Sequence, residues 1–143
     1  MAPLTRRPPI NEAWALLGEL MRDHLRPRYL GLAADLELSP PQLQAVQRLD
    51  PEEPLPMNRL AGLLHCDNSN VTGIVDRLEA RGLVERRVAP HDRRVKQLVL
   101  TDEGQAVRRR IAEAMETPPE PLQRLTPAEA RELRDLLRKA LAG

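Results

Sequence analysis

Fourteen prolines constrain this chain of 143 residues more than any other feature, because proline fixes its own φ and has no backbone N–H to donate. Proline is tolerated in the first turn of a helix, but it interrupts a helix interior or a central β-strand. After residue 3, the prolines lie at positions 8, 9, 27, 40, 41, 51, 54, 56, 90, 118, 119, 121 and 127. Several proline-free segments of helix length lie between them, so the sequence predicts a mostly helical protein.

The first and last helices are each predicted by a stripe of residues at helical spacing, suited to packing against other helices. The stripe of the first helix consists of Ile10, Trp14, Leu17, Met21 and His24. Pro27 is expected to kink or end this helix. The last helix is predicted to begin after Thr126, because Pro127 and Glu129 complete a capping signature. Its stripe consists of Ala130, Leu133, Leu137 and Leu141.

Three shorter helices in the middle of the chain are predicted from their caps. Ser39 opens the first, since proline follows it and Gln42 is placed to reach back in a capping box. The second is centred on Leu60–Leu64, and Asp67 or Asn68 can cap the third only a few residues later. A turn this short between two helices suggests a helix-turn-helix.

The third of these helices, within the stretch Ser69–Gly82, carries Gly73 in its interior, where glycine costs roughly 0.5 to 1 kcal/mol relative to alanine. One predicted face is apolar and consists of Val71, Ile74, Val75 and Leu78. At about 100° per residue, the opposite face consists of Ser69, Thr72, Gly73 and Asp76. Gly73 is therefore expected to face outward, and Gly82 fits the end of the helix.

A two-stranded hairpin with a basic tip is predicted next, from the runs LVERRV and VKQLVL on either side of APHDRR. From Arg77 to Lys96 there are seven basic and three acidic residues, although the net charge of the whole chain is only +1. Arg93 and Arg94 repel each other in the predicted turn, and Asp92 can hold one of them in position. Such a turn suits a polyanion, although a solvated charged loop remains the alternative.

A helix-turn-helix followed by a basic hairpin is the arrangement of a winged helix, whose second helix enters the major groove while the hairpin reaches the adjacent minor groove. Without a side chain at Gly73, the helix backbone can come closer to phosphates or base edges. Ser69, Asn70 and Thr72 are short polar residues suited to contacting them. The alternative is that these residues only solvate an exposed helix face.

From about Ile10 to Leu141 the chain resembles the MarR family of bacterial transcriptional regulators. The resemblance is most specific in CDNSNVTGIVDRLEARGLVERRVAPHDRRVKQLVLTDEG, Cys66–Gly104. It implies a homodimer whose first and last helices intertwine, with one winged helix per subunit reading half of a palindromic operator. It also implies that Asp92 and Arg94 form the wing's Asp-x-Arg pair, with the arginine in the minor groove, and that Arg77 contacts phosphate.

The expected fold is therefore mostly α with a small β-hairpin: a winged helix-turn-helix (39–101) between an N-terminal dimerisation arm (1–38) and C-terminal helices that complete the dimerisation region (102–143). The expected DNA contacts are Asn68, Ser69, Asn70, Thr72, Gly73 and Arg77 in the helix, and Asp92, Arg93, Arg94 and Lys96 in the wing. The expected dimerisation residues are Trp14, Leu17, Met21, Leu133, Leu137 and Leu141. The chain departs from the family at Pro56, where many relatives have a serine or threonine cap.

Composition excludes other classes of protein. Trp14 and Tyr29 are the only aromatic residues, so the core must be aliphatic. A single cysteine, Cys66, excludes an intrachain disulfide, and we expect a cytoplasmic protein because no secretion signal or membrane-spanning apolar run is present. His65 and His91 lack a repeated metal-ligand spacing, and no catalytic motif is found, so we expect neither an enzyme nor a metal or cofactor.

The sequence thus predicts a DNA-binding regulator, a repressor, and the family resemblance adds modulation by a small ligand, often an aromatic or phenolic anion. One alternative is a helical module that uses its winged helix to bind a partner protein. Another is a redox-sensing regulator that acts through Cys66, although oxidation-sensing relatives carry their reactive cysteine near the amino terminus.

Overall fold

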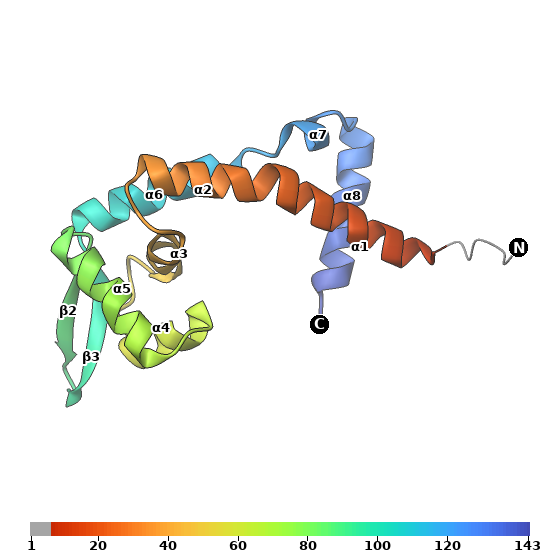
Figure 1. Cartoon of the computed structure of the whole chain (residues 1–143). Helices are drawn as coiled ribbons and strands as arrows, with labels where there is room; N and C mark the ends of the chain where they lie inside the picture. Colours follow the sequence, from red (N-terminus) through yellow and green to blue (C-terminus); the bar gives the residue numbers. More distant parts are fainter. Residues whose placement is uncertain (1–6) are drawn as a thin grey trace, which may run out of the picture. The chain divides into compact units, whose positions relative to one another are not determined.

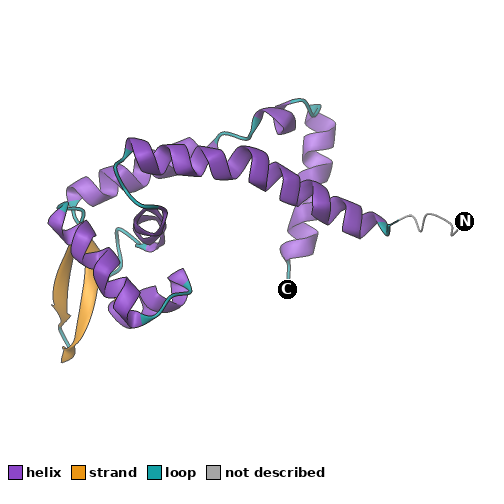
Figure 2. Ribbon diagram, viewed as in Figure 1, coloured by secondary structure: helices purple, strands orange, loops and turns teal. Residues whose placement is uncertain are grey.

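The structure is a computed structural model that describes residues 7–143, except for the side chain of Asn68 (Figure 1). Its elements are α1 (Pro9–Leu20), η1 (Met21–Leu25), α2 (Arg26–Asp35), α3 (Pro40–Arg48), β1 (Leu55–Pro56), α4 (Met57–Leu64), α5 (Asn68–Ala80), β2 (Val84–Ala89), β3 (Asp92–Leu100), α6 (Asp102–Glu116), α7 (Glu120–Gln123) and α8 (Pro127–Leu141). Helices dominate, as predicted, and the strands form one small sheet (Figure 2). The chain divides into two compact units: residues up to Leu25 together with Glu116–Gly143, and Arg26–Met115.

The unit Arg26–Met115 is built around an aliphatic core, which confirms the prediction made from the scarcity of aromatic residues. The largest side chains that are completely enclosed are Leu43, Leu49, Leu60, Leu78, Leu98, Ile111, Val46, Val71, Val75 and Val84. Apart from Leu49, which caps the end of α3, they come from α3, α4, α5, the sheet and α6, so these elements share one core. Full burial of a side chain of this size stabilises the fold by about 1.5 to 3 kcal/mol.

Side-chain caps begin α3 and α5 where the sequence predicts them. The Gln42 backbone N–H donates to Ser39 Oγ at 3.3 Å, and the Ser39 backbone N–H donates to Gln42 Oε1 at 3.1 Å, which completes the capping box. At the start of α5, Asp67 Oδ1 accepts the Asn70 backbone N–H at 3.1 Å. Of the two predicted caps, Asp67 is therefore the one that acts, and Asn68 is the first helical residue.

Gly82 ends α5 in the left-handed conformation, with φ of 71°, as its predicted position after the helix requires. The Leu83 backbone N–H donates to the Leu78 carbonyl at 3.0 Å, and the Gly82 N–H donates to the Glu79 carbonyl at 2.9 Å. The Thr101 hydroxyl donates to the Gly82 carbonyl at 2.6 Å and accepts a backbone N–H of the first turn of α6 at 3.0 Å. The end of α5 is thereby tied to the start of α6.

The predicted hairpin is present, but its second strand is longer and its turn is shorter than expected. β2 and β3 pair antiparallel from Val84 opposite Leu100 to Ala89 opposite Asp92, with a bulge between Val88 and Ala89. The tip is consequently the short stretch Pro90 and His91. Arg93 and Arg94, expected in the turn, belong to β3, because ladder pairing resumes at Asp92 beyond the bulge.

A third strand, β1, was not predicted and gives the sheet the order β1-β3-β2. It contains only Leu55 and Pro56, which pair with Leu98 and Gln97 of β3. Pro56 is also the residue before α4 and makes no side-chain cap, in line with the departure seen in the sequence. A strand of two residues is too short to show an alternating pattern, so the sequence carried no signal for it.

Pro27 was predicted to kink or end the first helix, and it does not end the helical run. After α1 the backbone passes through the π-helical segment η1 and continues directly as α2, whose second residue is Pro27. A π-helical turn shifts the hydrogen bonds from i→i−4 to i→i−5 and locally widens the helix. Proline is then located in the first turn of α2, where its missing N–H is tolerated.

The C-terminal helices follow the predicted caps with one addition. Helix α6 buries Ile111 and packs Val107 and Met115 against the core, as expected. It ends at Glu116, before the proline-rich stretch, but the short helix α7 forms within that stretch and was not predicted. At the start of α8, the Thr126 backbone N–H donates to Glu129 Oε2 at 2.8 Å, and the Glu129 N–H donates to Thr126 Oγ1 at 3.3 Å, which confirms the second capping box.

Candidate nucleic-acid interface

Helix α5 has one buried face and one exposed face, as its sequence pattern predicts. Val71, Val75 and Leu78 lie in the core, and Ile74 packs against it. The exposed residues that were expected to contact DNA are Ser69, Asn70, Thr72, Gly73 and Arg77. Asn68 stands at the start of the same helix, but its side chain lies outside the described part of the structure.

The helix start is organised by Asp67. Its Oδ1 accepts the Ser69 hydroxyl at 3.0 Å as well as the Asn70 backbone N–H. The hydroxyl hydrogen of Ser69 is therefore engaged within the protein, and its oxygen keeps lone pairs that can accept a hydrogen bond. The Asn70 side chain lies on the exposed surface of the first turn, where an amide can both donate and accept.

The packing of the protein itself does not require a glycine at position 73. A Cβ placed there would meet no atom within 4 Å outside the helix's own nearby backbone. Gly104 is the contrasting case, because a Cβ there would lie 2.0 Å from the Leu83 carbonyl oxygen. The open surface at Gly73 lets an external molecule approach the helix backbone.

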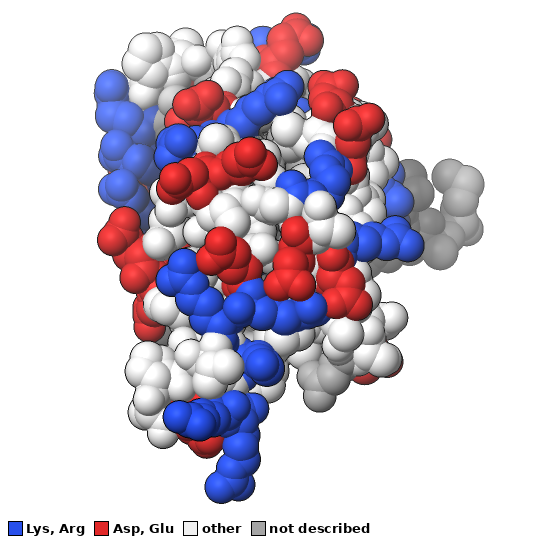
Figure 3. Space-filling model, turned by 90° about the vertical axis from the view of Figure 1, so that its left-hand side faces the viewer, with Lys and Arg blue, Asp and Glu red and all other residues white. Residues whose placement is uncertain are grey.

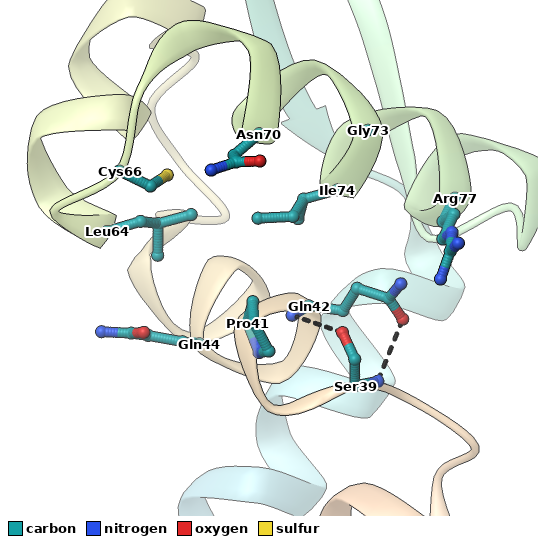
Figure 4. Close-up of a pocket in the computed structure, with 10 residues that line it drawn as sticks. All are labelled: Ser39, Pro41, Gln42, Gln44, Leu64, Cys66, Asn70, Gly73, Ile74 and Arg77. Carbon is teal, nitrogen blue, oxygen red and sulfur yellow. Dashed lines mark hydrogen bonds between the residues drawn. The ribbon is translucent and has the colours of Figure 1, made fainter.

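Beside Gly73 runs a groove of about 380 Å³ between α3 and α5, which we call the α3–α5 groove (Figure 4). Its lining residues are Ser39, Pro41, Gln42, Gln44, Leu64, Cys66, Asn70, Gly73, Ile74 and Arg77. Figure 4 shows Asn70, Gly73 and Arg77 following one another along α5, with the capping box of α3 across the groove. Three of the expected DNA contacts thus share one concave surface with Cys66.

Arg77 is exposed, and among the side chains that the structure describes it has no hydrogen-bond or ion-pair partner. An exposed guanidinium without an internal partner keeps its donors available for an external anion. Its place on α5, one turn after Gly73, aligns it with the exposed face of the helix.

A second groove of about 330 Å³ lies between α5 and the wing, and we call it the α5–wing groove. Its lining residues are Met57, Asn58, Val71, Thr72, Arg94, Val95 and Lys96. This groove brings Thr72 of the helix together with Arg94 and Lys96 of the wing, although 22 positions separate Thr72 from Arg94 in the sequence. The helix and the wing therefore form a continuous candidate interface.

The wing exposes its basic residues. The side chain of Arg94 is 96% exposed, and its Nε lies 4.0 Å from Asp92 Oδ1. The same oxygen accepts the Arg94 backbone N–H at 3.0 Å, so Asp92 holds the backbone of Arg94 more closely than its guanidinium. Arg93 is likewise exposed. Figure 3 shows lysine and arginine at the lower end of the molecule, where the hairpin ends, and both charge signs mixed over the surface above it.

Sequence reasoning missed Arg86, which connects the wing to α5. From β2, Arg86 forms ion pairs with Asp76 through Nη2 and with Glu79 through Nη1, the latter at 3.1 Å. Its backbone N–H also donates to Glu79 Oε2 at 3.2 Å. Asp76 and Glu79 could have indicated it, because two carboxylates one turn apart on a helix expected to contact DNA would repel phosphate unless a cation compensated them.

The residues expected to form the dimer lie in the other compact unit, on α1, η1 and α8. Trp14 is 75% exposed and Met21 is 55% exposed in the single chain. Leu137 and Leu141 are also exposed, while Leu17 and Leu133 are half-buried. Large apolar side chains exposed together on consecutive turns are typical of a surface that another protein covers.

Other kinds of site receive no support from the described residues. Within residues 7–143, histidine, cysteine, aspartate and glutamate do not gather in groups of three or more that could hold a metal ion. No helix in that part of the chain combines the length and apolar character needed to cross a bilayer. Cys66 is a half-buried free thiol at the edge of the α3–α5 groove.

Comparisons with known proteins agree with this geometry. The sequence model of the MarR family matches residues 38–96. An uncharacterised helix-turn-helix transcriptional regulator of Bacillus subtilis, YfiV, is 32% identical over 78 residues, which cover 54% of this chain and about half of that protein (49%). A MarR-family protein from Bacillus stearothermophilus has a similar structure, with a TM-score of 0.79, 26% identity, and coverage of 92% of this chain and 91% of that one.

The fold is also shared with a variant of Staphylococcus aureus MepR bound to an oligodeoxyribonucleotide. That comparison has a TM-score of 0.64 and 21% identity, and it covers 90% of this chain and 96% of the other.

Proposed function

The chain belongs to the MarR family of transcriptional regulators, and from this we propose that it binds double-stranded DNA sequence-specifically, as a homodimeric repressor on a palindromic operator. The observation that carries the proposal is the exposed face of α5, which presents short polar side chains and the open surface at Gly73, and where Thr72 shares a groove with the exposed Arg94 of the wing. The relative bound to an oligodeoxyribonucleotide lends support, because it shares the fold.

In the proposed complex, α5 enters the major groove. Ser69, Asn70 and Thr72 lie in its first turns and reach base edges, while the N-terminus of the helix attracts a phosphate. The absence of a side chain at Gly73 permits the closest approach of the helix backbone to the duplex. Asn68 is assigned to the same contact region from its position alone.

Phosphate contacts and the wing supply the remaining affinity. Arg77, unpartnered among the described side chains, contacts a phosphate, which positions the helix without selecting a sequence. Arg94 enters the minor groove, and Arg93 and Lys96 contact the phosphate backbone of the DNA beside that groove. Asp92 fixes the backbone of Arg94 through the bond to its N–H.

Dimerisation brings two such interfaces onto one operator. Residues 1–38 and 102–143 contain the dimerisation region, and residues 39–101 read the DNA. Two-fold symmetric dimers bind half-sites one helical turn, or a multiple of it, apart. The exposed apolar side chains of α1 and α8 supply the surface for the second copy.

A small aromatic or phenolic anion is proposed to change the affinity for DNA. This part rests on family membership alone. A panel of phenolic and aromatic carboxylates added to the preformed complex tests it: release of the operator by at least one compound at unchanged ionic strength supports ligand control, and no release by any of them speaks against this class of ligand.

Selection of bound sequences from random duplex DNA tests the central proposal. An enriched palindrome, bound by the purified protein with a steep dependence on salt, is the expected result. A protein-interaction module predicts no enriched sequence, and a mainly apolar protein interface would respond weakly to salt. Failure to enrich any sequence would overturn specific DNA binding.

A further inference from the structure

Arg81, the C-cap residue directly after α5, uses its charge within the protein. Its Nη1 donates to the Glu37 backbone carbonyl at 2.6 Å, and its Nη2 donates to the Leu36 carbonyl at 3.0 Å. Both acceptors follow directly after α2, 44 and 45 positions earlier in the chain. The guanidinium therefore bridges the end of the reading helix and the end of α2, within the same compact unit.

These carbonyls need a donor from elsewhere. They lie just beyond the last turn of α2, where the helical hydrogen bonding has stopped and the negative end of the helix dipole favours a cation. Glu37 adopts the left-handed conformation, with φ of 54°, and turns the backbone out of the helix so that its carbonyl and that of Leu36 face the arginine. Leu36 and Leu38 are buried on either side of this turn, which fixes it to the core.

The contrast with Arg77, one helical turn earlier, is informative. Arg77 is exposed without a partner among the described side chains, whereas both terminal nitrogens of Arg81 are engaged by the protein itself. Arg77 in the last turns of α5 is thus available to an external partner, whereas Arg81 at its C-cap, four residues later, has internal partners. From their charge alone, Arg77 and Arg81 would both be expected to contact DNA phosphate.

We propose that Arg81 is a positioning residue for DNA recognition: it sets the orientation of the reading helix against α2 and does not contact phosphate. This inference rests on the proposed function. Hydrogen bonds from a charged donor are among the stronger ones, and the bond to the Leu36 carbonyl is partly buried although the bond to Glu37 is exposed. Loss of both bonds therefore loosens the C-terminal end of α5. Base contacts, which depend on the geometry of the helix, suffer more than non-specific attraction to phosphate.

The test compares Arg81→Ala, Arg81→Lys and Arg77→Ala with the unaltered protein. Fluorescence anisotropy measures binding to the selected operator and to a scrambled duplex over a series of salt concentrations. Titration at high protein concentration first gives the active fraction of each preparation, so that a partly unfolded variant does not pass for a weak binder.

For Arg81→Ala we expect operator binding to weaken on the order of tenfold, as removal of one or two charged hydrogen bonds implies, with a smaller effect on the scrambled duplex. The salt slope stays as in the unaltered protein. Arg77→Ala, by contrast, weakens both duplexes alike and lowers the slope by about one unit, because one arginine no longer neutralises a phosphate. Arg81→Lys, which can still donate to a carbonyl, recovers part of the operator affinity.

A salt slope that falls in Arg81→Ala as it does in Arg77→Ala would show that Arg81 contacts phosphate and would overturn the proposal. An equal loss of affinity on both duplexes, or none on the operator, would overturn it as well. The unaltered protein reports separately on the proposed function, since only the absence of any operator preference in that sample would contradict specific DNA binding itself.

Discussion

At position 73 the stability of α5 and its proposed close approach to DNA favour different residues. The open space around Gly73 would accept a methyl group, so Gly73→Ala should stabilise the protein by up to about 1 kcal/mol through helix propensity. The same methyl group would stand between the helix and the duplex, so operator affinity should fall. Urea unfolding and anisotropy measure the two effects, and unchanged or improved affinity would remove the proposed reason for the glycine.

Arg94 and Asp92 are expected to act on sequence-dependent shape. Arg94→Ala should weaken binding more on an operator with A·T-rich flanks than on one with G·C-rich flanks, because narrow A·T-rich minor grooves attract arginine most strongly. Asp92→Ala should reproduce part of this selective loss, since Asp92 holds the Arg94 backbone N–H. Anisotropy titrations on both duplexes measure the difference.

Asp92→Asn is the matched control, because its amide oxygen can still accept the Arg94 N–H although the negative charge is gone. We expect this variant to keep most of the flank preference. If the wing acted only through its net charge, both Asp92 variants would bind more tightly, and that result would contradict the orienting role.

At the scale of the elements, the parts of the fold that depend on neighbouring residues were predictable. The caps at Ser39, Asp67 and Thr126 and the stop at Gly82 are short-range signals, and the structure confirms each of them. The apolar face of α5 and the hairpin follow from periodicity in the same way. These elements place the candidate recognition helix and wing in order along the chain.

The remaining features depend on residues that are far apart in the sequence. β1 forms because Leu55 pairs with Leu98 of β3, and no local sequence pattern predicts so short a strand. The link from Arg86 to α5 likewise requires the wing to fold back onto the helix. Pro27 was expected to disturb the helix because proline lacks a backbone N–H. The structure accommodates it with a π-helical segment just before the proline, so the chain stays helical.

Arg86 should hold the wing against α5. Its side chain is only 25% exposed and forms two ion pairs, so Arg86→Ala should cost about 1 to 3 kcal/mol of unfolding free energy and leave two carboxylates uncompensated. Operator binding should weaken because the wing is held less firmly and because the two free carboxylates repel phosphate. Arg87→Ala is the control, since its ion pair with Glu85 is well exposed and such pairs contribute about 0 to 1 kcal/mol. Equal urea midpoints for the two variants would contradict this role of Arg86.

The start of α8 should be sensitive to acid. The bond from the Thr126 backbone N–H to the Glu129 carboxylate holds the pKa of Glu129 below its usual value. A carboxyl whose pKa is lower in the folded state stabilises the fold above its unfolded pKa, and this contribution is lost as the pH falls through the folded value. In Glu129→Gln, a neutral amide oxygen can still accept the bond, so the helicity of α8 should depend less on pH. Circular dichroism from pH 7 downward measures this, and identical acid profiles would contradict it.

At the scale of the whole molecule, the exposed apolar side chains of α1 and α8 are the feature that a single chain leaves without explanation. Trp14 and Leu141 are 75% and 84% exposed, and Leu136 is 60% exposed. Transfer of such surface out of water on association would release about 25 cal/mol for each Å² of apolar area buried, before the cost of association is subtracted. We propose that a second copy of the chain buries these apolar side chains in a dimer interface.

Deletion of residues 127–143 should therefore abolish the dimer and, with it, high-affinity operator binding, because in the proposed complex one subunit contacts only half of the palindrome. Sedimentation gives the assembly state directly. Trp14 is the chain's only tryptophan, so its emission provides a second measurement: it should be blue-shifted in the intact protein, where the partner covers it, and red-shifted in the truncated chain. Because intertwined dimers seldom leave a stable folded monomer, a folded, full-length monomer at micromolar concentration would contradict this assembly, even if DNA binding were retained.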